Sequence, residues 1–296
     1  VQAYSINLDF DKKISSKTQI FYGAEALLNV VRSSALRKNI VTGEQSPTNT
    51  RYPDNSSWQA YGAYLNLRYK PVNRLTFNAG IRYSHYQIRA EFDTLFFPFP
   101  FVTARNKNGA LNGGLGLVWQ PTGRTRFYSN LSTGFRAPNI DDMGKVFDSQ
   151  PGTVVVPNPA LKPEYAYNAE AGAVKTLGRF LKIDGAVYYT LLTNALARRD
   201  FKFNGADSID YEGEKSRVMA IQNVSSAYVY GLQAGISVML NKGFSLISKI
   251  NYQKGEEQSD DSLKWYPKSH VPPLFGRTEL NYTRKKLVLC FYAVYH

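Results

Sequence analysis

Two groups of cationic side chains stand close to carboxylates and amides, a chemistry suited to binding an anionic ligand. One group follows the segment GFRAP, and the other is an arginine pair at the predicted end of a strand. Guanidinium groups make paired hydrogen bonds to carboxylate-type oxygens, which gives such contacts both strength and direction. The candidate ligand-binding residues are Arg136, Asn139, Asp141, Asp142, Lys145, Arg198 and Arg199.

Residues that would make or break covalent bonds form no comparable group. No Ser–His–Asp order stands out, and no pair of acids lies in the apolar surroundings that acid catalysis requires. The single cysteine, Cys290, excludes an internal disulfide and a cysteine metal site, and the three histidines are dispersed. We therefore predict no enzyme, no catalytic residue, no resident metal and no cofactor.

Two acidic clusters leave calcium binding open. Loop carboxylates are the oxygen ligands that calcium prefers, but the Asp-x-Asn-x-Asp-Gly pattern is absent, so solvated acidic loops are the alternative. The clusters comprise Asp207, Asp210, Glu212 and Glu214 in one segment, and Glu256, Glu257, Asp260 and Asp261 in another.

The elements that must position these residues are β-strands. In RFLKIDGAVYYTLL, the residues Leu181, Ile183 and Val187 share one face, while Lys182 and Asp184 share the other. This alternation recurs about twelve times, and no segment of similar length has helical periodicity. No stretch reaches the roughly 18–20 consecutive apolar residues of a membrane helix, but a membrane barrel needs only alternating apolar residues.

The connections between the predicted strands alternate in length. Short ones lie near 11–16, 70–73, 120–123, 176–178, 241–243 and 284–286, and long ones near 32–56, 92–108, 135–163, 200–216 and 255–274. Compact domains rarely contain five loops this long. Short turns at one end and long loops at the other are typical of a transmembrane antiparallel β-barrel.

Aromatic residues support the same interpretation, because rings gather at both membrane interfaces. One set flanks the short turns, and a second lies about eight to ten residues further along the strands, close to the 9–11 residues of a membrane-crossing strand. The first set is Phe10, Tyr69, Trp119, Phe127, Phe180, Phe244 and Tyr282; the second is Tyr83, Phe135, Tyr189, Tyr228 and Tyr252. We expect these rings to face lipid and the carboxylates Glu164 and Glu170 to face a polar lumen.

Two motifs on either side of one long loop carry a family resemblance. The segment GFRAPNIDDMGKVF is followed by PNPALKPEYAYNAEAG, and together they resemble the FRAP and NPxLKPE motifs of TonB-dependent outer-membrane receptors. The matching residues are Phe135, Arg136, Ala137 and Pro138, then Asn158, Pro159, Leu161, Lys162, Pro163 and Glu164. The motifs could equally be architectural, since residues that anchor a loop mostly carry structure.

The resemblance implies a part of a larger barrel. Such receptors have 22 strands, an internal plug and a TonB box, so residues 1–296 are expected to be a single partial barrel domain without the plug and the terminal strands. It implies capture of a scarce nutrient, such as a ferric siderophore-like chelate, and import energised by the inner-membrane partner TonB. Haem receptors of the family place a histidine between the motifs, and residues 139–157 contain none.

Three alternatives stay open at this point: a passive porin-like channel, an outer-membrane barrel enzyme such as a lipase or protease, and a surface adhesin. The net charge of +13 is spread over turns and loops. A nucleic-acid partner would need that charge on one surface together with exposed stacking aromatics. We therefore predict an outer-membrane location, contact with lipid, a small-molecule ligand and no nucleic acid.

Overall fold

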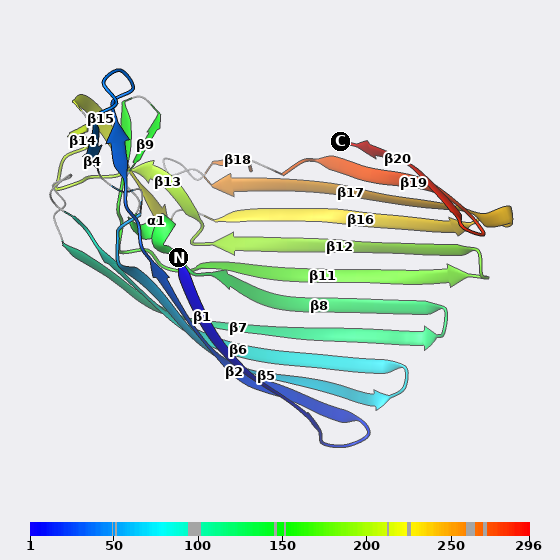
Figure 1. Ribbon diagram of the computed structural model, residues 1–296. Helices are drawn as coiled ribbons and strands as arrows, with labels where there is room; N and C mark the ends of the chain where they lie inside the picture. Colours follow the sequence, from blue (N-terminus) through cyan, green and yellow to red (C-terminus); the bar gives the residue numbers. More distant parts are fainter. Residues whose placement is uncertain are drawn as a thin grey trace.

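The structure is a computed structural model that describes residues 1–48, 50, 52–93, 102–144, 147–150, 152–211, 213–223, 226–258, 264–268 and 271–296. Twelve strands of this part lie side by side, in chain order, in one antiparallel sheet that we call the wall (Figure 1). They are β1 (Gln2–Lys13), β2 (Thr18–Val31), β5 (Ser56–Val72), β6 (Leu75–Glu91), β7 (Thr103–Thr122), β8 (Thr125–Arg136), β11 (Glu164–Leu177), β12 (Leu181–Thr193), β16 (Ala227–Met239), β17 (Phe244–Gln258), β19 (Leu274–Arg284) and β20 (Leu287–Tyr295).

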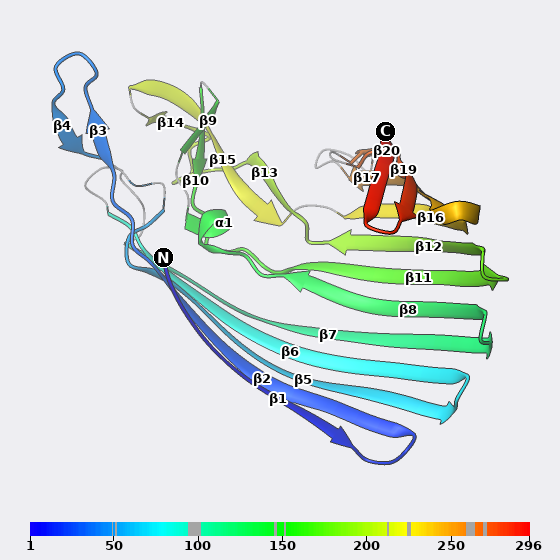
Figure 2. The same ribbon diagram turned by 45° about the vertical axis from the view of Figure 1, so that its right-hand side comes forward.

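The wall confirms the predicted twelve strands and the separation of short from long connections. All the short turns lie at one end, and Figure 2 shows the sheet curving between that end and the long loops. The turn between β16 and β17 contains a short 3-10 helix, η1 (Asn241–Gly243), and β18 (Trp265–Pro267) pairs with the loop-side end of β17. Among the described residues, no helix is both long and apolar enough to cross a membrane.

The two faces of the wall differ as the alternation predicts. Tyr167 and Val187 are about half exposed on the convex face, at 46% and 54% of their surface. Asn168 and Thr190 point to the other face, where their side chains are hydrogen-bonded at 2.8 Å. Because register pairs keep the same face across the sheet, the convex face is an apolar band and the concave face a polar one.

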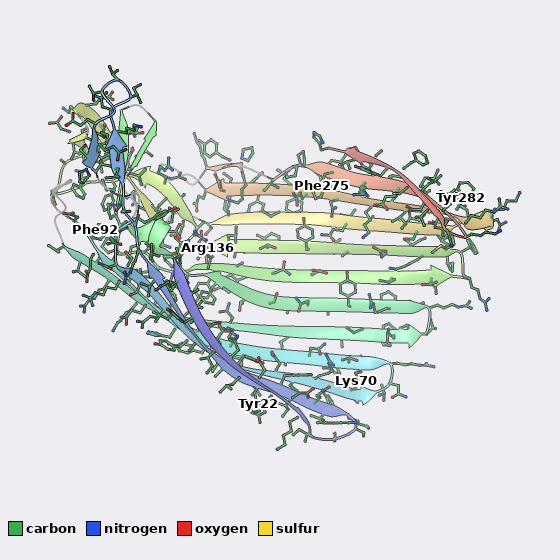
Figure 3. All side chains as sticks on the ribbon, viewed as in Figure 1. Tyr22, Lys70, Phe92, Arg136, Phe275 and Tyr282 are labelled. Atoms are coloured by element: carbon green, nitrogen blue, oxygen red, sulfur yellow. The ribbon has the colours of Figure 1, made fainter. Side chains whose placement is uncertain are left out.

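Aromatic pairs bridge neighbouring strands beside the short turns. Phe10 stacks on Tyr22, Trp119 on Phe127, and Phe244 contacts Tyr282, with ring centroids 5.1, 5.4 and 4.5 Å apart. A second group at the loop-side end includes Tyr189, Tyr228 and Trp265. Figure 3 labels Tyr22 and Tyr282 on the turn side and Arg136 beside the loops. The two predicted aromatic belts are therefore present on the convex face.

Several glycines on the concave face lie beneath side chains of the next strand. A Cβ atom at Gly172 would collide with the ring of Tyr128, and one at Gly231 with the hydroxyl end of Tyr188. Gly116, in the segment NGGLGL, has only ordinary van der Waals neighbours. The glycines therefore let long polar side chains lie flat on the sheet.

A second group of elements covers the loop-side end, and we call it the cap. It contains α1 (Ile140–Gly144), β9 (Phe147–Gln150), β10 (Thr153–Val156), β13 (Leu196–Asp200), β14 (Ser208–Tyr211) and β15 (Glu214–Asn223). These strands form a five-stranded sheet in which β10 and β15 are parallel, while β3 (Leu36–Lys38) and β4 (Gln45–Pro47) form a separate hairpin. The cap sheet has its own small core of Val154, Val156, Phe203, Val218 and Ala220.

The predicted long loops contain more strand structure than expected, since β3, β4, β9, β10 and β18 also lie within them. The expected loop 92–108 is shorter because β7 already begins at Thr103, and the expected loop 200–216 contains strand structure. β5, β6 and β7 have 17, 17 and 20 residues, more than a bilayer requires. Their loop-side ends bury Tyr86, Ile88 and Ala104 against the cap, so these strands are stabilised beyond the membrane band.

Candidate functional site

The FRAP and NPxLKPE motifs meet at the loop-side end of the wall. Arg136 is the last residue of β8, and Glu164, the first residue of β11, is its register partner. Figure 3 shows Arg136 close to α1, on the side of the wall where the loops gather. The sheet therefore brings together two motifs that lie 28 residues apart in the chain.

The Arg136 guanidinium is shared between two carboxylates. Its Nη2 donates to both oxygens of Asp142, each at 2.7 Å, and its Nη1 donates to Glu164 Oε2 at 3.2 Å. Glu164 also accepts the backbone N–H of Leu196 through its other oxygen, which ties β13 to the same network. The side chain of Asp142 is only 12% exposed, so this contact is better shielded from water than a surface ion pair.

Asn139 and Asp142 fix the start of α1 by reciprocal hydrogen bonds. The backbone N–H of Asp142 donates to Asn139 Oδ1 at 2.9 Å, and the N–H of Asn139 donates to Asp142 Oδ2 at 3.1 Å. This is the geometry of a capping box, with each side chain satisfying a backbone donor of the other residue. The Asp142 carboxylate therefore accepts hydrogen bonds both from the start of α1 and from Arg136.

Apolar residues of the cap pack on the concave face of the wall. Met143 and Leu161 are 0% and 1% exposed, and with Ile140 they contact Tyr86 and Ile88 of β6. The five-residue α1 is too short to be stable by itself, so this burial holds it in place.

Asparagines hold the NPxLKPE backbone. Asn106 Nδ2 donates to the carbonyl oxygens of Pro159 and Leu161 at 2.9 and 2.7 Å, and Asn158 Nδ2 donates to Ile221 O at 2.8 Å. Asn223 accepts the N–H of Lys162 at 2.7 Å and donates to its carbonyl oxygen at 2.8 Å. These bonds satisfy backbone groups that Pro159 and Pro163 keep out of a β-ladder.

Two of these asparagines were missed by sequence reasoning. Asn106 lies two residues before Asn108 on the concave face of β7, and Asn108 Nδ2 donates to both Asn106 Oδ1 and Leu161 O. The repeat RNKN carries that spacing, which is a weak signal. Nothing in the sequence connects Asn223 with Lys162, since 61 residues separate them.

The remaining candidates are not joined to Arg136 by any hydrogen bond or ion pair described above, or they lie outside the described residues. Arg198 and Arg199 are on β13 of the cap, with Arg198 exposed and Arg199 half-buried, and Asp141 is in α1. Lys145 lies outside the described residues, as do Glu212, Asp260 and Asp261 of the acidic clusters. Over the described ranges, no three His, Cys, Asp or Glu side chains are grouped as metal ligands.

The geometry separates two kinds of residue within the predicted site. The Arg136 guanidinium, the Asn139 amide oxygen and the Asp142 carboxylate are hydrogen-bonded within the chain, so they hold the base of the loop. Arg198 and Arg199 lie on β13 of the cap sheet, where Arg199 Nη1 donates to the backbone oxygen of Arg198 at 3.2 Å. The site is thus a rigid base formed by the two motifs beneath a separate sheet.

A comparison with protein-family models identifies the kind of barrel to which this wall belongs. The model described as TonB dependent receptor-like, beta-barrel, matches residues 2–289. The chain belongs to the TonB-dependent receptor family. Residues 2–289 of this receptor chain include both motifs, the whole cap and the wall as far as the first residues of β20.

Curated relatives of this receptor chain include proteins of haemoglobin utilisation. It is 29% identical over 203 residues to the hemoglobin-haptoglobin utilization protein B of Neisseria meningitidis, covering 62% of the chain and 25% of that protein. It is 32% identical over 157 residues to the hemoglobin-binding protein A of Haemophilus influenzae, covering 46% and 14%. The chain thus matches a quarter or less of the length of these relatives.

Solved structures show the same fold at low sequence identity. The copper transporter OprC superposes with a TM-score of 0.75 at 16% identity, over 95% of this chain and 41% of that chain. The Serratia marcescens hemophore receptor HasR, in complex with its hemophore HasA and heme, gives 0.70 at 15%, over 96% and 49%. A copper transporter and a hemophore receptor thus share this fold, so the fold alone does not identify a ligand.

Proposed function

We propose that this chain is the barrel wall and loop-side cap of an outer-membrane receptor that captures a scarce iron-bearing nutrient and imports it. The observation that carries the proposal is the match of residues 2–289 to the receptor barrel model. It is supported by the polar concave face, the apolar convex face and the two aromatic belts. The wall supplies rigidity and a hydrated lumen, and the cap supplies the outer binding surface.

In this proposal the complete receptor is a 22-stranded barrel with a plug in its lumen, energised by TonB. The solved barrels that superpose on the chain are more than twice as long as the part it covers, which supports a larger closed barrel. The flat, polar concave face fits a globular plug, because Arg82 and Tyr64 lie along the sheet instead of projecting into the lumen. Arg198 and Arg199 of the cap are proposed as ligand contacts, with Arg136, Asn139, Asp141, Asp142 and Lys145 forming the base beneath them.

Haem taken from a haemoglobin-type protein is the cargo that the curated relatives favour. Both relatives described above have names that refer to haemoglobin. A ferric siderophore-like chelate is the second candidate, and the arginines of β13 favour it because guanidinium groups bind carboxylates and catecholates. The absence of histidine between the motifs also separates this chain from the haem-receptor pattern.

Growth on defined iron sources tests the proposal. A host strain lacking its own receptor gene is given the complete gene, an empty vector, or the gene with Arg198→Ala and Arg199→Ala. Haemin, haemoglobin or a panel of ferric siderophores serves as the sole iron source. Growth on at least one source that requires both the gene and a functional tonB gene supports the proposal, and growth independent of tonB supports a passive channel.

The same assay distinguishes the two cargoes. Growth on haemoglobin and haemin, without growth on any siderophore, assigns the haem class. Growth on a siderophore that falls with the double arginine variant assigns the chelate class. Full growth of Lys202→Ala, an exposed lysine close to the same arginines in sequence, provides the matched control.

A further inference from the structure

β7 and β8 separate toward the loop side of the wall. Their register pairs run up to Gly114 with Ser132, and no further pair follows among the described residues. β7 stays paired with β6 as far as Thr103, and β8 stays paired with β11 as far as Arg136. Figure 1 shows β6 and β7 continuing past the end of β8 toward the loops. We call the unpaired interval between β7 and β8 the split.

One threonine closes the base of the split. Thr133 Oγ1 accepts the backbone N–H of Gly113 at 2.8 Å and donates to the Gly113 carbonyl oxygen at 3.3 Å. These bonds take the place of the next backbone pair of the ladder. Further up, Phe135 of β8 packs against an apolar cluster that contains Tyr86 of β6 and Ala104 of β7. Across the described residues, the split is therefore closed by one hydroxyl group and by apolar packing, and not by a ladder.

The concave face is hollowed beside the base of the split. This inner hollow has a volume of about 800 Å³, and its lining includes carboxamides from four adjacent strands: Asn66, Asn78, Asn112 and Asn130. Arg82, which also lines it, is paired with Glu25. Arg68 lies 5.3 Å from the ring of Phe21 and has no carboxylate partner in the described part of the chain. Amide donors and an unneutralised guanidinium suit an oxygen-rich, negatively charged head group.

The convex face is hollowed on the opposite side of the same base. This outer hollow has a volume of about 480 Å³, and its lining includes the apolar and aromatic side chains of Leu115, Leu131, Tyr167, Ala169, Tyr189 and Leu191. Gly113, Gly114 and Thr133 line both hollows. Because the two glycines have no side chains, the wall between the hollows is little thicker than the backbone. The outer hollow suits an alkyl chain, since burial between apolar groups removes the chain from water.

We propose that the split opens at Gly113 and Thr133 and admits an amphiphilic cargo sideways, from the lipid phase into the lumen. The cargo class is an anionic, oxygen-rich iron chelate that carries one alkyl chain. Its head occupies the inner hollow at Arg68 and the asparagine amides, and its chain lies across the split in the outer hollow. This route rests on the proposed import function, and it narrows the cargo of that import to one chemical class.

A resident membrane lipid does not match this pair of hollows. Lipids of a leaflet keep their head groups in the interfacial region, whereas Arg68 and the asparagines face the lumen, on the other side of the wall. A molecule that fills both hollows therefore has its polar part separated from its apolar part by the thickness of the sheet. One chain on a compact head meets this condition.

Binding to the complete receptor in amphipol, without a bilayer, tests the opening. The probes are the ferric complexes of one citrate–hydroxamate chelator that bears either a dodecyl chain or no chain, each loaded with radioactive iron. Wild type should bind the alkyl chelate about tenfold more tightly than the chainless one, because part of the chain leaves water in the outer hollow.

Two tryptophan substitutions on β11 locate the chain. Ala169→Trp fills the outer hollow and should remove most of the tenfold preference, while the chainless chelate binds as before. Ala173→Trp places the same side chain on the same strand and face, outside the hollow, and should leave both affinities unchanged. Arg68→Gln removes the free charge of the inner hollow and should weaken the alkyl chelate about fivefold. Thr133→Val removes both bonds at the base of the split and should speed association of the alkyl chelate alone.

Three results would overturn the opening. They are equal affinity of wild type and Ala169→Trp for the alkyl chelate, an equal loss in Ala173→Trp, and displacement of the alkyl chelate by an equal concentration of phosphatidylethanolamine. Heat-modified gel migration confirms that every variant is folded. The growth assay is a separate test, since its failure would leave these affinities unaltered. Loss of the opening would in turn leave import of a chainless nutrient standing.

Discussion

The wall and the cap are held together by different interactions. The wall is an antiparallel ladder in which side chains alternate between the convex and the concave face. Its polar contacts join neighbouring strands, as Asn168 with Thr190, or strands separated by one other, as Arg82 with Glu25. The cap depends on a few shielded contacts between distant segments, above all Asn106 with Leu161 and Arg136 with Asp142. A wall built from many equivalent contacts tolerates the loss of one, while the cap depends on each.

The largest expected effect is a charge on the lipid face of the wall. Val187→Arg should lower the free energy of unfolding by ~2–4 kcal/mol, because an arginine near the bilayer midplane loses its hydration. Urea unfolding in lipid vesicles, followed by tryptophan fluorescence, measures this change. Asn78→Arg places the same side chain on the concave face at an exposed position and should leave the unfolding midpoint within error. Comparable losses in the two variants would show that the facing assignment is wrong.

A second substitution tests the dependence of the cap on single contacts. Asn106→Ala removes the donor to the Pro159 carbonyl and the shorter of two donors to the Leu161 carbonyl, in a site where Asn106 is 5% exposed. The expected cost is about 1–3 kcal/mol, concentrated in the cap. Hydrogen exchange should show faster exchange in residues 152–163 while the wall keeps its protection. Asn78→Ala is the matched asparagine control, and uniform loss of protection across wall and cap would contradict the distinction.

The Arg136 network should give a smaller effect, because the guanidinium is 47% exposed to solvent. Arg136→Gln is expected to cost about 1 kcal/mol after allowance for that exposure. Arg136→Lys keeps the charge but loses the paired geometry with Asp142, so it should recover only part of the loss. Proteolysis of the loop between β8 and β11 measures the change. Full recovery by lysine would show that charge alone matters there.

The smallest effect is expected from an ion pair on the concave face. Arg82 pairs with Glu25, and the two side chains are 33% and 44% exposed. Glu25→Gln should change stability by less than about 1 kcal/mol, because exposed pairs are screened by water and salt. Unfolding at 0.05 M and about 0.5 M salt should remove any difference from wild type. A loss as large as that of Arg136→Gln would weaken the contrast between wall and cap.

The sequence predicted the wall well because a two-residue period assigns every side chain to a face. Ile183 and Val187 were expected to face lipid, and both are exposed on the convex face. The start of β7 was missed because Asn106 and Asn108 look like loop residues, although they point inward and bind the backbone at Leu161. These buried positions carry polar side chains because the backbone at Leu161 packs against them, and that contact cannot be read from the sequence of β7 alone.

The cap was less predictable because its contacts join residues far apart in the chain. Arg136 and Glu164 were recognised as motif residues, and the possibility that the motif is architectural was open from the start. Asp142, the second carboxylate on Arg136, was predicted to bind a ligand, and that stays a prediction; its carboxylate is bonded to Arg136 and to the start of α1. Which segments meet depends on the order of strands in the wall, and no local pattern encodes that order.

The flat concave face has a mechanical consequence. Because Tyr128 and Tyr188 lie over Gly172 and Gly231, the distance from the backbone to whatever fills the lumen is set by ring thickness and not by side-chain length. Side chains held flat in this way project less from the concave face than the same side chains would if they stood upright. A methyl group at either glycine would collide with the tyrosine side chain above it and push that side chain away from the sheet, so both positions control how closely the tyrosines lie to the backbone.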